Sequence, residues 1–305
     1  MEIYLPVAQL AVNSFVLLGI GLAVGFLSGM LGVSGGFITT PLLIFYGIPS
    51  GIAVASQASP IAAASLVGAI RQGGKKSVDY KMGLWLLLGG LVGSSIGVGI
   101  FRLLQQAGQI DFTIRISYLI LLGTIGTLML VESVRAIRAA RKGVRIERRP
   151  GQHTWIHRLP FKLRFYRSAL YISVIPVIVL GLMVGVMTAI LGTGGAFILI
   201  PAKVYLLRMR TNLAIGTSQF QMFIVACMAT VLHSAVDGTV DIVLALILVI
   251  GGVVGAQFGV RAGARLRAEE LRTALALLII AIAIRLLFEL TLTPSDLYSV
   301  ITSFG

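Results

Sequence analysis

Two glycine-rich stretches of the chain have residue types and a spacing that could bind a solute. They cover residues 31–36 and 191–196, and each is followed by a Phe-Ile pair and then by a proline. Glycine lets the backbone turn sharply and leaves N–H groups uncovered. A helix that begins after such a turn points the positive end of its dipole at it, so the turn would attract an anion without a lysine or arginine. The candidate binding residues in these turns are Gly32, Ser34, Gly35, Gly36, Gly192, Gly194 and Gly195.

Neutral polar side chains interrupt the apolar sequence after each glycine turn. Ser56 and Gln57 form the first cluster, and Thr217, Ser218 and Gln219 form its counterpart. Hydroxyl and amide groups can replace the hydration shell of an oxyanion, which makes these residues candidate side-chain donors. The alternative interpretation is structural: the glycines would serve close helix packing, and the polar side chains would hydrogen-bond neighbouring helices.

Arg71 and His233 lie at the ends of equivalent apolar segments. Each is either an interfacial anchor or a vestibule or gating residue that guides an anion, and His233 would also titrate near neutral pH. The sequence has no phosphate-binding loop for ATP, no nucleophile–base pair, a single cysteine and three scattered histidines. We therefore expect no catalytic residue, no metal site and no cofactor, and we do not expect an enzyme.

The glycine turns belong to an internal repeat. Between residues 21–41 and 181–201, ten of 21 positions are identical without a gap. The match continues where 53–57 aligns with 214–218 and where Asp79 aligns with Asp241. Glycines at four-residue spacing also correspond, and we interpret them as helix-packing stripes rather than as a site. They are Gly89, Gly93 and Gly97 in the first half and Gly251, Gly255 and Gly259 in the second.

The elements that must position these groups are membrane-spanning helices. The chain is 57% hydrophobic and 12% charged, whereas a soluble domain has about 25% charged residues. Its apolar stretches are long enough to cross about 30 Å of hydrocarbon. We predict an all-α polytopic membrane protein with two inverted-topology repeats of about five segments each. The segments are expected at about 14–30, 36–46, 52–70, 82–104, 113–134, 170–190, 196–207, 212–234, 240–262 and 271–292. The short members, 36–46 and 196–207, are expected to be broken or re-entrant.

The inverted orientation is predicted from the charges of equivalent loops. The loop at 71–81 has four Lys or Arg, whereas its counterpart at 233–241 has none. The loop at 46–51 is uncharged, whereas 203–212 carries three basic residues. Because basic loops remain in the cytoplasm, equivalent loops should lie on opposite sides of the cell membrane, with both chain ends outside. Cytoplasmic loops then account for the net charge of +14, and we expect no nucleic acid partner.

A basic segment divides the two halves. Residues 135–168 contain eleven Lys or Arg and one acidic residue, which is typical of a cytoplasmic linker and would contact anionic membrane lipid. We expect a first transmembrane repeat at 1–134, the linker at 135–168, a second repeat at 169–292 and a C-terminal tail at 293–305. The oligomeric state is left open.

The chain resembles the TauE/SafE sulfite exporter family, which is also called the toluene-sulfonate-uptake permease family. The resemblance is carried by LGVSGGFITTP at 31–41, LGTGGAFILIP at 191–201 and AIGTSQ at 214–219. It implies transport of small sulfur-containing anions, such as sulfite, sulfonates or sulfoacetate, across the cytoplasmic membrane. In secondary transporters with paired broken helices, the substrate lies near the membrane midplane, where these helices are interrupted.

These observations lead to one functional prediction. The protein is expected to be a secondary transporter or permease for a small sulfur-containing anion, bound at the paired glycine turns and moved by alternating access. A coupling proton or ion, or the gradient of the substrate itself, would drive it, because the sequence shows no ATP-binding motif. Two alternatives stay open: an anion channel of similar selectivity, and a non-transporting membrane subunit that anchors a partner through the linker.

Overall fold

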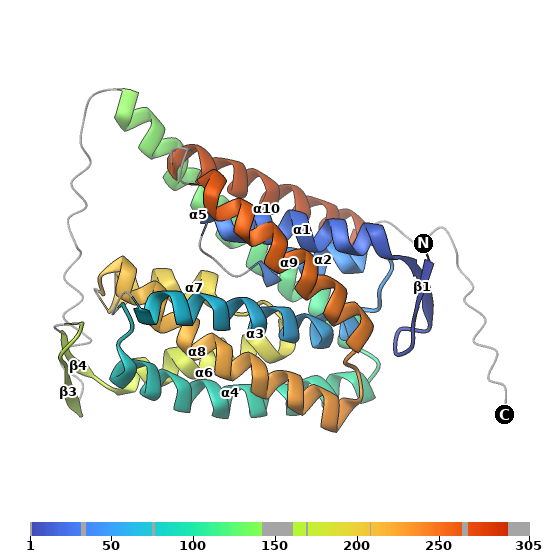
Figure 1. Cartoon of the computed structure of the whole chain (residues 1–305), viewed down its shortest axis with the longest axis horizontal. Coiled ribbons are helices and arrows are strands. Elements are labelled where there is room, and N and C mark those ends of the chain that lie inside the picture. The colour runs from blue at the N-terminus through green and yellow to red at the C-terminus, as the bar shows by residue number, and fades with distance from the viewer. Residues whose placement is uncertain are drawn as a thin grey trace.

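The computed structural model describes residues 2–31, 35–74, 77–141, 161–168, 170–207, 209–263 and 268–291. The first half of the chain is a strand hairpin followed by five helices (Figure 1). Its elements are β1 (Glu2–Leu5), β2 (Leu10–Asn13), α1 (Ser14–Leu31), α2 (Gly36–Phe45), α3 (Ser50–Gly74), α4 (Tyr80–Gln106) and α5 (Ile110–Arg141).

The second half has the same order of elements. Two of its helices continue as π-helical turns, labelled η2 and η3. The elements are β3 (Lys162–Phe165), β4 (Leu170–Ser173), α6 (Ile175–Leu191), α7 (Ala196–Pro201), η2 (Ala202–Leu206), α8 (Thr211–Leu232), η3 (His233–Asp237), α9 (Ile242–Gly263) and α10 (Ala268–Thr291).

The apolar segments are helical because a helix satisfies its backbone N–H and C=O groups internally, as hydrocarbon requires. Within the described ranges, six helices are long and apolar enough to cross a membrane. They lie at Ser50–Gly74, Tyr80–Gln106, Ile110–Val131, Thr211–Asp237, Ile242–Ala262 and Thr273–Thr291. The prediction of an all-α polytopic membrane protein is confirmed.

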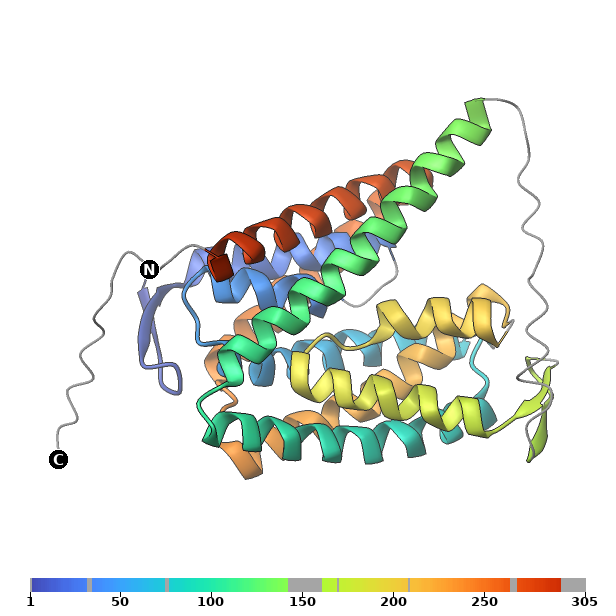
Figure 2. The same cartoon turned by 180° about the vertical axis from the view of Figure 1, so that it is seen from behind.

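The sequence did not predict the two strand hairpins. β1 pairs with β2 and β3 pairs with β4, each in antiparallel register, and each hairpin precedes the first helix of its half. The hairpins lie at opposite ends of the molecule (Figures 1 and 2). Residues 162–168, which the sequence places at the end of the linker, form β3 and the turn after it.

The glycine stripes bring helices of the two halves into backbone contact. A methyl group at Gly93 of α4 would collide with the carbonyl oxygen of Leu182 on α6, and one at Gly255 of α9 would collide with that of Leu22 on α1. The packing role expected for these stripes is therefore confirmed. The fourth helix of each half packs against the first helix of the other half.

The third helices of the two halves also pack on each other, as do the fifth helices. Arg115, near the start of α5, forms an ion pair with Glu289, near the end of α10, at 3.7 Å, and both views show these helices side by side (Figures 1 and 2). Gly68, late in α3, faces Gln219, early in α8. In both pairs the equivalent helices therefore run in opposite directions.

Two aspartates connect the halves through reciprocal hydrogen bonds. Asp79 and Asp241 each cap the helix that follows, α4 or α9, by accepting a first-turn N–H. The N–H of Asp79 donates to Oγ1 of Thr217 on α8 at 3.0 Å, and the N–H of Asp241 donates to Oγ of Ser56 on α3 at 2.9 Å. In both bonds, the N–H of an aspartate in one half donates to a hydroxyl on the third helix of the other half.

Candidate functional site

The two glycine turns meet inside the helix bundle. A Cβ atom at Gly36 would lie 2.8 Å from the carbonyl oxygen of Gly192 and 3.0 Å from that of Thr193, so only a glycine fits there. The rings of Phe37 and Phe197, which follow the turns at equivalent positions, pack with their centroids 4.9 Å apart. This contact is consistent with the prediction that one solute binds at the paired glycine turns.

The two turns differ in backbone conformation. Gly192, Gly194 and Gly195 all have positive φ, at 62°, 69° and 51°, a region that is unfavourable for residues with a side chain. Gly35 has a φ of −75° and lies just before α2. Gly32 and Ser34 lie outside the described residues, so the first turn is described only from Gly35 onward.

The start of α2 is the helix end that faces the first turn. The carbonyl oxygen of Gly35 accepts the N–H groups of Ile38 and Thr39, at 3.0 and 3.1 Å. The hydroxyl of Thr39 donates to the same oxygen at 3.2 Å. The preceding N–H groups, those of Gly36 and Phe37, have no acceptor within the helix. They supply the positive helix end that the sequence predicts at this place.

A small cavity lies beside the first turn, between α1, α2, α3 and α9. Its volume is ≈ 50 Å³, which is room for about two water molecules. Gln57 lines it and is only 4% exposed, and its Oε1 has no hydrogen-bond partner among the described residues. Since buried amides are normally paired, Gln57 is a polar group held open to this cavity. Glycine-turn and hydroxyl residues complete the polar lining: Ser28, Gly35, Gly36 and Thr39.

Most of the other predicted donors are engaged elsewhere. Ser56 and Thr217 accept the N–H groups of the two capping aspartates, and both are fully buried. Ser218, the counterpart of Gln57, accepts a hydrogen bond from Nζ of Lys203 at 2.9 Å. Gln219 packs against Gly68 and is partly buried. The structure thus brings together the glycine turns and Gln57, and gives these remaining donors contacts within the protein.

Lys203 is a buried lysine, although its position in the sequence places it in a basic loop. Its side chain is fully buried, and the carboxylate of Asp79 is its electrostatic partner. The repeat alignment places Leu43, which is also fully buried, at the equivalent position. The sequence holds one signal of this buried lysine: a charged residue in the second short segment aligns with an apolar residue in the first. The two repeats therefore differ where their short helices meet α3 or α8.

His233 is buried, with 1% exposure, and is not at a solvent-facing vestibule. Nδ1 contacts Oδ2 of Asp237 and Nε2 contacts the carbonyl oxygen of Ala189, both at 3.0 Å. The ring also packs edge-on against Phe101. Asp237 was not a predicted site residue, although its i, i+4 spacing from His233 is visible in the sequence. Arg71 is exposed in the last turn of α3.

The described residues contain no cluster of three His, Cys, Asp or Glu side chains that could hold a metal ion. The polar groups gathered at the glycine turns are instead neutral hydrogen-bonding groups and a helix end. Such a set can bind a small anion by charge–dipole attraction and hydrogen bonding.

Comparison with known proteins identifies related chains. The model of the family described as sulfite exporter TauE/SafE matches residues 17–286. The chain is 27% identical over 221 residues to the probable membrane transporter protein YjnA of Bacillus subtilis, covering 72% of this chain and 79% of that protein. It is 25% identical over 231 residues to the probable membrane transporter protein YunE of the same organism, covering 72% and 78%. A probable membrane transporter protein of Xylella fastidiosa is 27% identical over 230 residues, covering 74% and 77%. No solved structure matches the chain significantly.

Proposed function

The chain belongs to the sulfite exporter TauE/SafE family, and from this premise we propose that it moves a small sulfur-containing anion across the cell membrane. The family and the names of the relatives support a multi-pass membrane transporter. We propose in addition that the solute is an anion of the sulfite, sulfonate or sulfoacetate type. It would bind where the two glycine turns meet.

The observation that carries the proposal is the open amide of Gln57. Rotation of the amide presents either its oxygen or its NH₂ group to the cavity. Next to it, the first N–H groups of α2 bring partial positive charge without a full cation. An oxyanion bound here would receive hydrogen bonds from both groups, and the apolar surroundings would strengthen them.

The packing of the repeats supports alternating access. Equivalent helices run in opposite directions, as expected for repeats of inverted topology, and the glycine turns lie where the halves meet. The cavity of ≈ 50 Å³ lies between helices of both halves, α1, α2 and α3 of the first and α9 of the second. Rocking of one half against the other would open it to one side of the membrane at a time.

The first test is binding to the full chain in detergent. We expect the melting temperature to rise with sulfite, sulfate, thiosulfate, sulfoacetate or taurine, selectively for one of them, and to change little with chloride or simple carboxylates. A ligand that binds only the folded protein stabilises it in this way. Gln57→Leu should fold and lose the part of the stabilisation that is specific to this anion, because leucine fills a similar volume without the amide.

Gln221→Leu is the matched control. Gln221 is a fully buried amide on α8 whose Nε2 donates to the carbonyl of Leu86, away from the cavity. This variant should keep the anion-induced shift, even if its baseline melting temperature falls. Equal loss of the shift in both variants would remove Gln57 from the site.

Transport is then measured with the protein in liposomes. Saturable uptake of the anion that stabilises the protein, reduced by Gln57→Leu and not by Gln221→Leu, is the expected result. Ohmic current in a planar bilayer would instead identify a channel. Absence of both flux and current for every anion of the panel would reject the proposed transport.

A further inference from the structure

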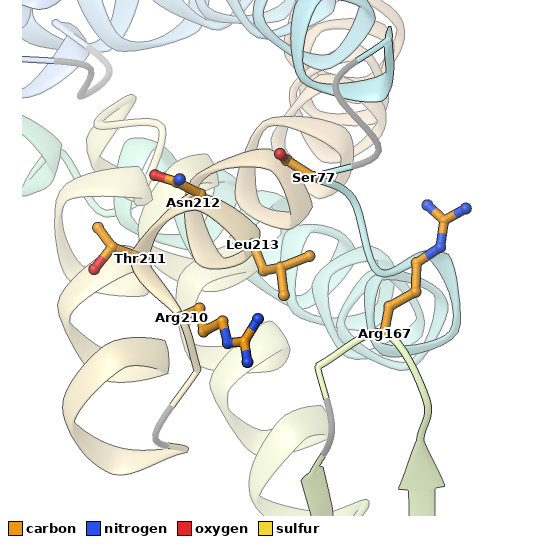
Figure 3. Close-up of a pocket in the computed structure, with 6 residues that line it drawn as sticks. All are labelled: Ser77, Arg167, Arg210, Thr211, Asn212 and Leu213. Atoms are coloured by element: carbon orange, nitrogen blue, oxygen red, sulfur yellow. The ribbon is translucent and has the colours of Figure 1, made fainter.

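A basic pocket lies at the end of the molecule that carries β3 and β4. Its volume is ≈ 680 Å³, and it is formed by the loop before α4, the turn between β3 and β4, and the first turn of α8 (Figure 3). The lining residues are Ser77, Arg167, Arg210, Thr211, Asn212 and Leu213. The pocket shares no residue with the cavity beside Gln57.

Both charged residues of the pocket are arginines. The backbone carbonyl of Arg210 accepts the N–H of Ala214, and its side chain is exposed. Figure 3 shows this side chain extending from the start of α8 into the open space. Arg167 is held by the carbonyl oxygen of Val78 at 2.8 Å and lies over the ring of Tyr80. Asp79 follows Val78 in the chain, but it is only 2% exposed. Its carboxylate accepts hydrogen bonds from Ser168 and not from Arg167. The pocket therefore presents positive charge without a carboxylate among its lining residues.

The equivalent helix start in the first half shows what such a position binds. By the repeat alignment, Ser50 at the start of α3 corresponds to Thr211 at the start of α8. The carboxylate of Asp111 accepts the N–H of Ser50 at 3.2 Å, so an anionic group occupies that helix end. On α8 the residue in the capping position is Arg210, and it provides no side-chain cap. The second half keeps the same helix start but surrounds it with arginines.

We propose that this pocket binds an oxyanion head group of the phosphate or sulfonate type. The first N–H groups of α8 have no acceptor within the helix and carry the positive end of its dipole. The guanidinium of Arg210 can donate two parallel hydrogen bonds to such a group. The bound oxyanion takes the place that Asp111 occupies in the first half.

The pocket lies beside the basic loops at 71–81 and 203–212, which the positive-inside rule assigns to the cytoplasmic face. The oxyanion there is either a free solute or the phosphate of an anionic lipid, and both present the same chemistry to the arginine and the helix end. The site is independent of the proposed transport substrate, because it shares no residue with the Gln57 cavity.

The free-solute arm measures thermal stabilisation of the full chain by sulfate and by inorganic phosphate, with chloride at equal ionic strength as reference. Arg210→Gln should raise the concentration needed for half of the stabilisation by about tenfold, since one charge-assisted hydrogen bond is lost. Arg102→Gln is the control, because Arg102 is an exposed arginine of α4 outside both cavities. It should leave the response unchanged.

A second variant fills the site with a charge from the chain itself. Thr211→Asp places a carboxylate at the start of α8, as Asp111 does for α3. We expect a higher melting temperature without any added anion and loss of the further rise with sulfate. An unchanged sulfate response in Thr211→Asp and in Arg210→Gln would exclude a free solute as the occupant.

The lipid arm counts phosphatidylglycerol molecules retained by the protein in native mass spectrometry, with phosphatidylcholine as the neutral reference. Loss of one retained phosphatidylglycerol in Arg210→Gln and not in Arg102→Gln identifies the lipid as occupant. The proposal is overturned if neither arm distinguishes Arg210→Gln from Arg102→Gln. Gln57→Leu should keep the stabilisation by inorganic phosphate, which is not in the transport panel, so failure of this site and failure of the transport proposal are told apart.

Discussion

At the scale of single residues, the buried polar groups divide into those with a partner inside the bundle and those without one. His233 belongs to the first kind. Its two ring nitrogens contact the carbonyl oxygen of Ala189 and the carboxylate of Asp237, both at 3.0 Å. The Oε1 of Gln57 belongs to the second kind, and Gln57 also borders the cavity, which makes it the better candidate to contact solute.

His233→Leu is expected to destabilise the protein strongly. It leaves the carboxylate of Asp237 buried without a partner, which costs about 3–5 kcal/mol in comparable buried pairs. Asp237→Leu should have a similar effect by leaving the histidine alone. Thermal unfolding in detergent measures both. The double variant should be more stable than either single one, and simple additivity of the two losses would contradict the paired assignment.

Gly35 and Gly195 occupy equivalent positions in the two glycine turns. Each packs against a valine on the first helix of its half. A methyl group at Gly35 would collide with Cγ1 of Val24, and one at Gly195 would collide with Cγ1 of Val184. A valine at either glycine would therefore disturb this packing, so a loss of binding in such a variant would not identify the binding site. A sharper comparison uses alanine together with a smaller partner.

We expect Val24→Ala to recover most of the stability lost in Gly35→Ala, because Gly35 has a φ that alanine adopts freely. Val184→Ala should recover less of the loss in Gly195→Ala. There the φ of 51° remains, and a left-handed conformation costs an L-residue about 1–2 kcal/mol. Melting temperatures of the single and double variants measure how much stability is recovered in each half. Equal recovery in the two halves would mean that backbone conformation is not the difference.

At the scale of elements, the starts of α4 and α9 connect a helix, a hairpin and the other half of the chain. The carboxylate of Asp79 accepts the N–H of Ser168 in the β3–β4 turn, and that of Asp241 accepts the N–H of Val7 in the β1–β2 turn. Each hairpin thus rests on a helix end of the opposite half. Asp79 has the additional task of balancing the charge of Lys203.

Asp241→Ala should cost about 1–2 kcal/mol, the usual range for a lost helix cap. Asp79→Ala should cost more, because Lys203 is left as a buried charge without its carboxylate. Adding Lys203→Leu, which copies Leu43 of the first half, should restore part of the stability in the Asp79→Ala background and none in the Asp241→Ala background. Thermal unfolding of the four proteins checks this, and equal effects of Lys203→Leu in both backgrounds would refute the link.

At the scale of the whole molecule, the two halves are held by exchanged pairs of helices. The first helix of one half packs against the fourth helix of the other, and the third and fifth helices pair across the halves. All of these contacts join helices in the described part of the chain. We therefore expect the two halves to assemble through their helices.

Replacing residues 143–158 by a Gly/Ser segment of equal length should leave most of the anion flux in liposomes. A flexible segment of that length still joins the halves, while the binding residues and helix pairs are untouched. Complete loss of flux with normal thermal stability would favour the alternative in which the linker anchors a partner. A scrambled linker that keeps all basic residues is the control for composition.

The sequence by itself determined the helices, the glycine packing stripes and the two turns. These features are local: the length of an apolar run decides whether a segment spans hydrocarbon, and glycine at four-residue spacing decides which helix face admits a close neighbour. The same locality explains why most of the ten segments were placed within a few residues of the observed helices. The exceptions are α5, which continues seven residues beyond the predicted end at 134, and the segment predicted from residue 170, whose first four residues form β4. The hairpins escaped prediction because their pairing is short and rests on helix ends from the other half.

Only the tertiary structure decided which polar residues are open to a solute. Ser56 and Gln57 are neighbours of similar polarity, but Ser56 bonds to Asp241, far along the chain, while Gln57 borders the cavity. Ser218 occupies the position equivalent to Gln57 and is paired with Lys203. Whether a buried donor is used up depends on which distant helix packs against it. That is a property of the assembled bundle, and it is not contained in the residue type or spacing.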